Sequence, residues 1–339
     1  MDATNLIQAI LWGLANGAVL ALVALGYTLV YGIIELINFA HGDLFMMGSF
    51  VSLTLLVNLA YTKTARGGRG ALAVHGIPLV LLVVGVLLAA MVFCAVLNVA
   101  IERLAYRPLR RAPRLAPLIS AIGVSFTLIN LGQLWKGSVP QDFPDLVPNV
   151  NILDKWLHLT DKVSFTTKDL MAIGVAVPLM LGLAAFIQRT KLGRAMRATA
   201  QDREAAALMG INIDLTISLT FLLGGALAGA AGLIYGLYTL QVWYLQGFRN
   251  GLIAFTAAVL GGIGNVRGAA IGGFLIGLVA SISDLGFAAI FPSLQHLPVL
   301  SALTGLDQKW TIVVIFAALI LTLIFRPSGL MGEEVAEKA

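Results

Sequence analysis

The sequence contains little charge and only one cysteine. Asp, Glu, Lys and Arg together make up 12% of the 339 residues, about half of their share in soluble domains. Hydrophobic residues make up 59%, which is more than one water-soluble core can bury. The lone Cys94 excludes an intramolecular disulfide and a multi-cysteine metal site, and its apolar surroundings predict a small buried side chain. The composition therefore predicts a chain embedded in a membrane.

Motifs for nucleotide and metal chemistry are missing as well. No G-x-x-x-x-G-K-[ST] run is present, so the chain cannot itself cradle the phosphates of ATP. The histidines are widely spaced and lack the grouping of metal ligands: His41, His75, His158 and His296. The net charge of +5 comes with arginines at the ends of apolar segments, which indicates membrane topology rather than nucleic-acid binding. We expect no catalytic residue, metal or cofactor in this chain.

Apolar runs long enough to cross a bilayer, about 17–20 residues, recur along the whole sequence. The N-terminus lacks the basic region and cleavage site of a signal peptide, so we expect the first run to be a retained span. The runs cover residues 6–34, 39–61, 77–101, 115–135, 170–188, 215–248, 250–266, 268–283 (extending to about 290) and 310–325. At about 1.5 Å per residue, 215–248 is too long for one crossing, so one span plus an interfacial or re-entrant piece is expected there. The predicted fold is an all-α polytopic bundle with about nine spans.

Two clusters of basic residues predict the orientation. The segment after the third span carries Arg103, Arg107, Arg110, Arg111 and Arg114, and the segment after the fifth carries Arg189, Lys191, Arg194, Arg197 and Arg203. Two crossings lie between the clusters, so both face one side, which the positive-inside rule makes the cytoplasm. The C-terminus then lies in the cytoplasm, and the N-terminus and the loop 137–168 lie in the periplasm. Lys63, Arg66 and Arg69 oppose this scheme but are outnumbered.

Glycine is concentrated between Gly224 and Gly286 and recurs there at four-residue spacing. The pairs are Gly225/Gly229, Gly232/Gly236, Gly268/Gly272 and Gly273/Gly277. Small residues let membrane helices approach closely, and we favour packing within one bundle over a dimer face. The run GGIGN predicts a helix break, which is tolerated in a membrane where it is buried in protein or lines a cavity. Gly261, Gly262 and Asn265 are therefore candidates for a pathway or gate.

The segment 189–214, predicted to be cytoplasmic, contains RTKLGRAMRATAQDREAAALMGIN. Alanines favour a helix with a low profile against a partner, and Gly210 can take the left-handed conformation that ends it. The spacing from Glu204-Ala205-Ala206 to Gly210 resembles the EAAxxxG loop of ABC importer permeases. That resemblance implies that Arg197 and these four residues contact an ATPase; the alternative is an ordinary amphipathic linker. The Ile-x-Leu-Pro continuation lacks its proline here, which disfavours the sugar- and metal-type subfamilies.

Three further segments narrow the resemblance. Residues 26–50, centred on Asn38-Phe39-Ala40-His41-Gly42-Asp43, are similar to the N-terminal signature of branched-chain amino acid ABC permeases. Residues 258–277 and the closing 326–330, RPSGL, also resemble that family. The resemblance implies one permease domain over 1–339 in a bacterial inner membrane. It also implies a second homologous permease, two cytoplasmic ATPases that bind ATP and magnesium, and a periplasmic binding protein.

The polar residues around Asn38 allow two interpretations. Asn38 would cap a helix that begins at Phe39, with Asp43 in its first turn, where the helix dipole favours an acid. Alternatively, Asn38, His41, Gly42 and Asp43 line the translocation path or its gate, since a charge inside a membrane is costly without a function. Elsewhere, Asp284 is expected at the interface. Arg249 is expected at the outer surface, where it either orients its span or attracts a substrate carboxylate.

These observations predict the permease subunit of an ATP-driven importer for branched-chain amino acids. Three alternatives stay open. The same machine could carry urea, short amides or other amino acids. An ion-coupled transporter could use Asp43 and His41 as coupling groups, and a passive channel would show no uphill accumulation.

Overall fold

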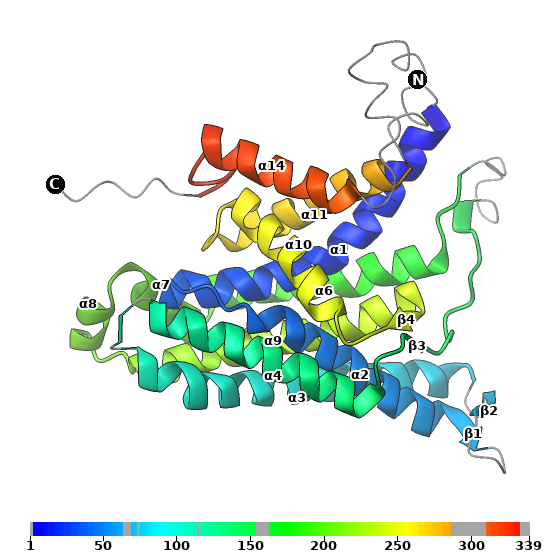
Figure 1. The fold of residues 1–339 in the computed structure, drawn as a ribbon, viewed down its shortest axis with the longest axis horizontal. Helices are drawn as coiled ribbons and strands as arrows, with labels where there is room; N and C mark the ends of the chain where they lie inside the picture. Colours follow the sequence, from blue (N-terminus) through cyan, green and yellow to red (C-terminus); the bar gives the residue numbers. More distant parts are fainter. Residues whose placement is uncertain are drawn as a thin grey trace. The chain divides into compact units, whose positions relative to one another are not determined.

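The computed structural model describes residues 3–63, 69–72, 75–110, 112–113, 115–153, 163–285 and 310–332, and they are mostly helical (Figure 1). The chain forms two compact units. The first contains Met1–Thr28, Val147–Leu181 and Ile253–Ala339, and the second contains Leu29–Leu146 and Gly182–Leu252. Within the described residues, seven helices are long and apolar enough to cross a membrane. The predicted all-α polytopic class is therefore confirmed.

Four long helices form the body of the second unit and lie side by side in Figure 1. They are α2 (Ala40–Ala60), α3 (Ile77–Ile101), α4 (Leu115–Lys136) and α9 (Ile213–Thr239). Gly225 and Gly229 of α9 face the backbone of α3 so closely that a Cβ would collide with it, and Gly232 does the same against α2. Ser49 of α2 donates a hydrogen bond of 3.0 Å to the Gly232 carbonyl oxygen. The prediction that these glycines pack inside one bundle is confirmed.

Shorter elements join these helices in the second unit. A π-helical turn η1 (Glu102–Tyr106) and a 3-10 turn η2 (Arg107–Leu109) follow α3. The helices α7 (Lys191–Gln201) and α8 (Arg203–Leu208) precede α9. The strands β1 (Tyr61–Lys63) and β2 (Arg69–Leu72) form one antiparallel pair, and β3 (Gln141–Asp142) and β4 (Gln241–Val242) form another.

The first unit is held together by close contacts between α1 (Ala3–Ile34), which contributes residues 3–28 to it, and α11 (Val266–Leu285). Gly13 and Gly17 of α1 lie against Leu278 and Phe274, and Gly273 of α11 lies against Ala21, with no room for a Cβ. Helix α14 (Thr311–Phe325) packs on α11. Parts of α6 (Thr167–Arg189) and α10 (Gln246–Gly261) also belong to this unit.

A helix is present at each of the nine predicted spans, but α10 and α14 have only 16 and 15 residues. The run 215–248 is interrupted as predicted, because α9 ends at Thr239 and Leu240 adopts a left-handed conformation. The predicted break after Gly261 is also present. Residues 286–290 of the eighth predicted span lie outside the described residues, as do Arg66, Arg111, Arg114, His158 and His296. The number of crossings and the orientation stay predictions.

Candidate functional site

The segment between α6 and α9 folds into two short capped helices. Thr190 caps α7 by accepting a hydrogen bond of 3.0 Å from the Gly193 amide, and Arg197 donates to the carbonyl oxygen of Ile187. Asp202 ends α7 and caps α8, since its carboxylate accepts from the amides of Glu204 at 2.9 Å and Ala205 at 3.0 Å. An acidic N-cap satisfies donors that a helix leaves unpaired. The six-residue α8 therefore has a defined start.

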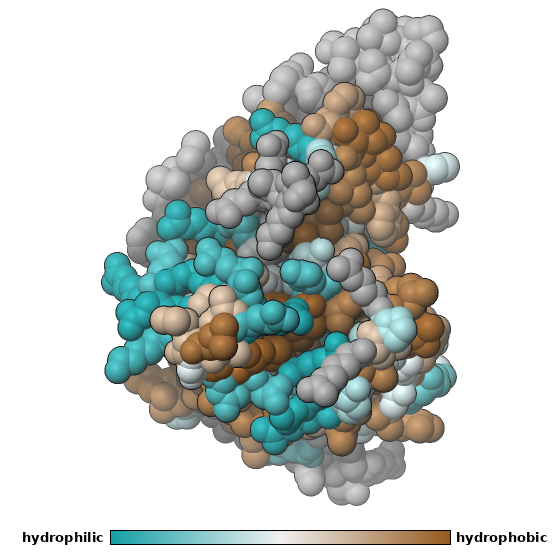
Figure 2. Space-filling model, turned by 90° about the vertical axis from the view of Figure 1, so that its left-hand side faces the viewer, coloured by the Kyte–Doolittle hydropathy of each residue, from teal (hydrophilic) through white to brown (hydrophobic). Residues whose placement is uncertain are grey.

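Helix α8 ends at an exposed apolar tip. Ala206 is buried, whereas Leu208 is 88% exposed and Met209 82% exposed. Gly210 has a φ of 81° and the amide of Ile211 returns to the Ala206 carbonyl oxygen, an arrangement that closes the helix. The predicted helix and its glycine terminus are therefore present. Figure 2 views the side on which α7 and α8 lie, where hydrophilic residues gather.

Arg203, the first residue of α8, makes a contact that sequence reasoning missed. Its guanidinium donates two hydrogen bonds to the Ile33 carbonyl oxygen, from Nε at 3.2 Å and from Nη2 at 2.6 Å. Ile33 lies one residue before the end of α1. In the sequence Arg203 is one basic residue among five in its segment, and nothing there indicates a partner 170 positions away.

A network of charged side chains joins the start of α9 to the residues that follow α3. Asp214, in the first turn of α9, accepts hydrogen bonds from Arg107 and, at 2.5 Å, from Arg110. Arg110 also pairs with Glu102, which is fully buried and accepts a bond of 2.7 Å from Ser218 of α9. Sequence reasoning used these arginines only for topology. The missed signal is the acid Glu102 at the end of a long apolar run.

Asn38 does not cap α2 with its side chain, so that interpretation was wrong. The N-cap position is Phe39, and no side-chain hydrogen bond caps this helix. The Asn38 carboxamide oxygen instead accepts a bond of 2.7 Å from the Tyr106 hydroxyl of η1. Tyr106 takes the place of the α2 amides as the partner of the Asn38 oxygen because Tyr106 is buried and its hydroxyl needs an acceptor.

His41, Gly42 and Asp43 are buried in the first turn of α2. Asp43 accepts a hydrogen bond of 2.5 Å from Ser125 of α4, while its other carboxylate oxygen has no partner among the described residues. Gly42 lies against the backbone of Gly247 and Gly251 in the first turns of α10. The second unit therefore brings Asn38, His41, Gly42 and Asp43 together around α2.

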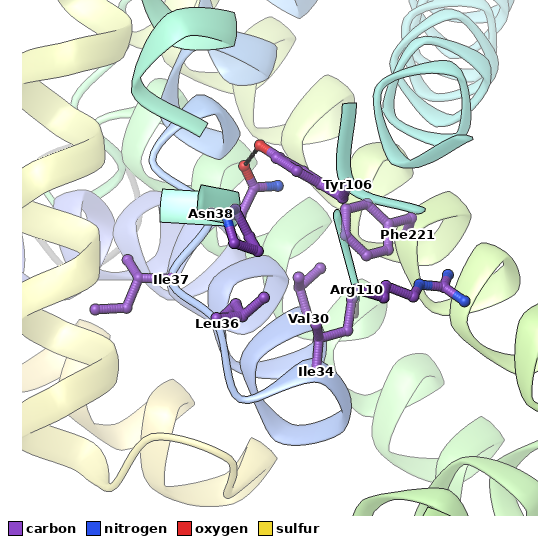
Figure 3. A pocket seen from close by; sticks show the side chains of 9 residues that line it. Val30, Ile34, Leu36, Ile37, Asn38, Tyr106, Arg110 and Phe221 are labelled. Atoms are coloured by element: carbon purple, nitrogen blue, oxygen red, sulfur yellow. Dashed lines mark hydrogen bonds between the residues drawn. The ribbon is translucent and has the colours of Figure 1, made fainter. Parts of the chain in front are cut away.

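A pocket of about 330 Å³, counting the space at its open mouth, lies beside Asn38 in the second unit. Figure 3 shows the Asn38 and Tyr106 side chains meeting at one end of it. The guanidinium of Arg110 points away from Leu36 and Ile37. The remaining walls are apolar: Val30, Ile34, Leu36, Ile37, Pro117 and Phe221. The carboxamide nitrogen of Asn38 is buried without a hydrogen-bond partner among the described residues.

Gly261, Gly262 and Asn265 lie at a turn in the first unit. The Asn265 side chain accepts bonds from the amides of Arg267 and Gly268 at the start of α11 and donates one of 2.7 Å to the Met331 carbonyl oxygen. Gly262 has a φ of 106° and lies against the backbone of Gly332. These contacts hold the segment after α14, and a role in a pathway stays a prediction.

The other residues singled out in the sequence have ordinary surroundings. Cys94 is buried in α3, as predicted. Asp284 is exposed and accepts a hydrogen bond of 2.6 Å from Thr311, and Arg249 is exposed on α10. Within the described residues, no group of three or more His, Cys, Asp or Glu side chains could hold a metal ion.

Comparison of the sequence with known proteins identifies the family of this chain. A family model described as "Branched-chain amino acid transport system / permease component" matches residues 9–324. The chain belongs to this family. The high-affinity branched-chain amino acid transport system permease protein BraD of Pseudomonas aeruginosa is 37% identical over 98% of the chain and 97% of its own length. The permease protein LivH of Escherichia coli K12 is 38% identical over the same shares.

A more distant relative, the probable branched-chain amino acid transport permease protein LivH of Methanocaldococcus jannaschii, is 28% identical over 92% of the chain and 88% of its own length. No solved structure matches. The protein is thus a multi-pass transport permease component. Its buried polar cluster and its exposed capped helix are the two features of the second unit that such a role can use.

Proposed function

We propose that this permease is one half of the translocation path of an ATP-binding cassette importer for branched-chain amino acids. A second, homologous permease supplies the other half, and a periplasmic binding protein delivers the solute. Two cytoplasmic ATPase subunits bind ATP and magnesium and drive transport. The chain lies in the bacterial inner membrane with its N-terminus in the periplasm and its C-terminus in the cytoplasm.

The observation that carries this proposal is α8. A six-residue helix cannot be stable in water by itself, yet both of its ends are fixed, and its apolar Leu208 and Met209 project into solvent. Exposed apolar residues framed by polar ones are typical of a contact with another protein. An ATPase groove that receives this tip is the partner that fits the permease family.

The contacts of α8 and of the segment after it provide a route by which movement of α8 would be transmitted to the translocation path. Arg203 attaches the start of α8 to the last turn of α1. Asp214, after α8, contacts Arg107 of η2 and also Arg110, which pairs with Glu102 of η1. Tyr106 of η1 in turn holds Asn38, the residue two positions before α2. A displacement of α8 would thus be felt at both ends of the 35–39 connection, where we propose that the gate lies.

Transport in proteoliposomes with the partner subunits tests the proposal. We expect uphill uptake of leucine, and weaker or no uptake of urea and acetamide, only when ATP is supplied on the α8 side. Glu204→Lys or Gly210→Pro should abolish uptake while the chain still inserts. Unchanged ATP-dependent uptake in both variants would remove the assignment of α8.

The location of α8 can be tested separately. Cys94 is the only cysteine, so Cys94→Ala provides a background for a single cysteine at position 208. A membrane-impermeant maleimide should label Leu208→Cys in inside-out vesicles only. Labelling in right-side-out vesicles would overturn the orientation.

One observation favours a second function. The buried Asp43 has a carboxylate oxygen without a described partner, which suits a coupling group of an ion-driven transporter. Uptake without ATPase subunits that collapses with an uncoupler would support that function instead.

A further inference from the structure

We infer that the pocket beside Asn38 is a station for the transported solute and holds its branched aliphatic side chain. This inference rests on the proposed function, and it assigns residues that contact the solute. It concerns only the second unit, to which all the residues that line the pocket belong.

The chemistry of the walls selects the ligand. Aliphatic side chains of Val30, Ile34, Leu36 and Ile37 line the pocket. Figure 3 shows Leu36 and Ile37 on one side and Phe221 on the other. Such walls favour a solute with an apolar branched end and reject a polar one, which would lose its hydration without new hydrogen bonds. The enclosed part of the pocket has room for little more than a water molecule, so its walls must move apart to admit a branched side chain from the open mouth.

Two residues that line the pocket carry a buried donor without a described acceptor, Asn38 at its carboxamide nitrogen and Arg110 at Nε. Asn38 is 4% exposed, and its carboxamide oxygen is occupied by Tyr106 while its nitrogen has no described acceptor. A buried donor without an acceptor is destabilising, so a ligand that accepts from it gains affinity. A carboxylate oxygen is the acceptor that a branched-chain amino acid offers. Its ammonium group can stay hydrated at the open mouth.

The Arg110 guanidinium is less suited to bind that carboxylate. Its two Nη atoms already pair with Glu102 and Asp214, and only its Nε lacks a described acceptor. Because the guanidinium also points away from Leu36 and Ile37, we assign recognition of the carboxylate to the Asn38 amide. Weak binding through one neutral donor suits a station from which the solute must leave.

Residues that line the pocket are connected to α8, so binding of the solute would be coupled to the movement of α8. Tyr106 and Arg110 line it and belong to the connection between η1 and Asp214. Ile34 follows Ile33, whose carbonyl oxygen accepts from Arg203. Movement of α8 would change the walls of the pocket and so release the solute.

A size series at Ile37 provides the first test. Ile37 is half-buried in the connection before α2, where a change of volume can be accommodated. In the reconstituted complex, Ile37→Phe should lower the leucine-to-valine uptake ratio at least about fivefold, and Ile37→Ala should raise it, because one methylene in an apolar pocket changes discrimination about 10–200-fold. The same binding protein delivers both solutes, so its preference cancels in the ratio to wild type.

Ile119 supplies the matched control, since it lies 68% exposed on α4 and does not line the pocket. Ile119→Phe and Ile119→Ala should leave the ratio unchanged. An equal loss of leucine and valine uptake in the Ile37 variants, or no change in their ratio, would overturn the inference. Uptake by the wild type that does not depend on ATP would instead contradict the proposed function. A failure of the pocket inference and a failure of the proposed function are therefore distinguishable.

Direct binding provides the second test. Saturation-transfer NMR with leucine and the purified permease complex, without the binding protein, should give a signal that Asn38→Asp lowers at least about fivefold. Asp keeps an oxygen for the Tyr106 hydroxyl but removes the donor and repels a carboxylate. Tyr106→Phe keeps the donor and should retain most of the signal. An unchanged signal in Asn38→Asp would remove Asn38 from the site.

Discussion

The end of α8 and the start of α2 belong to the same unit, but they differ in what they expose. At α8 the apolar Leu208 and Met209 lie in solvent, whereas at α2 the polar His41 and Asp43 are fully buried. Exposed apolar patches and buried polar groups are the informative departures from ordinary burial. We propose that the exposed apolar tip of α8 is a surface for a partner and that the buried polar start of α2 belongs to the path of the solute. Each can be disturbed without the other.

The largest effect is expected at the buried segment. A Cβ at Gly42 would overlap the Gly247 carbonyl oxygen and the Gly251 backbone, neither of which can rotate away. Gly42→Val should cost more than about 3 kcal/mol because overpacking against backbone is severe. We expect little monodisperse protein in detergent by size-exclusion chromatography.

Gly210 is the matched control for that variant. It has open space around the position of a Cβ, and only its φ of 81° disfavours a side chain. Gly210→Ala should therefore cost about 1–2 kcal/mol and leave the yield near wild type. Equal yields of Gly42→Val and wild type would show that the contact between α2 and α10 is loose.

At the exposed segment, the expected loss is in transport and not in folding. The double variant Leu208→Asp and Met209→Asp should lower ATP-dependent uptake at least about tenfold, because charges would be desolvated in a partner's groove. The melting temperature of the isolated permease should stay within about 2 °C, as for other surface changes.

Gln201→Asp adds a charge of the same sign at an exposed position of α7 and provides the control. Its uptake should match wild type. Equal losses in both variants would indicate general repulsion near the membrane surface instead of a contact made by the α8 tip.

Much of the fold could be predicted from the sequence because membrane helices obey one strong rule. Every backbone polar group in a bilayer must be satisfied within the protein, so long apolar runs become helices. The positions of α1, α2 and α9 followed from this rule, and the break after Gly261 followed from the glycine-rich run GGIGN. The terminus of α8 at Gly210 was predictable because left-handed backbone is cheap only for glycine.

The candidate site was less predictable because its contacts join residues far apart in the chain. Asn38 precedes a helix, and local reasoning offered a cap as one of two interpretations, but the hydroxyl of Tyr106, 68 positions away, binds its oxygen. Arg203 likewise lies in a basic segment and gives no sign of its bond to Ile33. Local patterns define elements, whereas such partners depend on which elements pack together.

The contact of Arg203 joins the start of α8 to the last turn of α1, just before the connection that leads to α2, and predicts an intermediate effect. Arg203→Met keeps much of the side-chain length but removes both hydrogen bonds to the Ile33 carbonyl oxygen. A charge-assisted bond of this kind contributes about 1.5–3 kcal/mol. We expect uptake to fall about threefold to tenfold while ATP hydrolysis continues, measured as solute transported per ATP. A proportional fall in hydrolysis would mean that Arg203 supports docking and not transmission.

The smallest effect is expected at Asp214, although it contacts both Arg107 and Arg110. Its side chain is 50% exposed, and exposed ion pairs contribute about 0–1 kcal/mol. In Asp214→Asn, Arg110 keeps its buried partner Glu102, so only the two exposed ion pairs with Asp214 are lost. Uptake should fall less than about twofold, and the difference from wild type should shrink further in 0.5 M salt, where exposed charges are screened. A loss as large as that of Arg203→Met, unaffected by salt, would mean that the force from α8 travels through α9 and η1, and that the attachment to α1 is secondary.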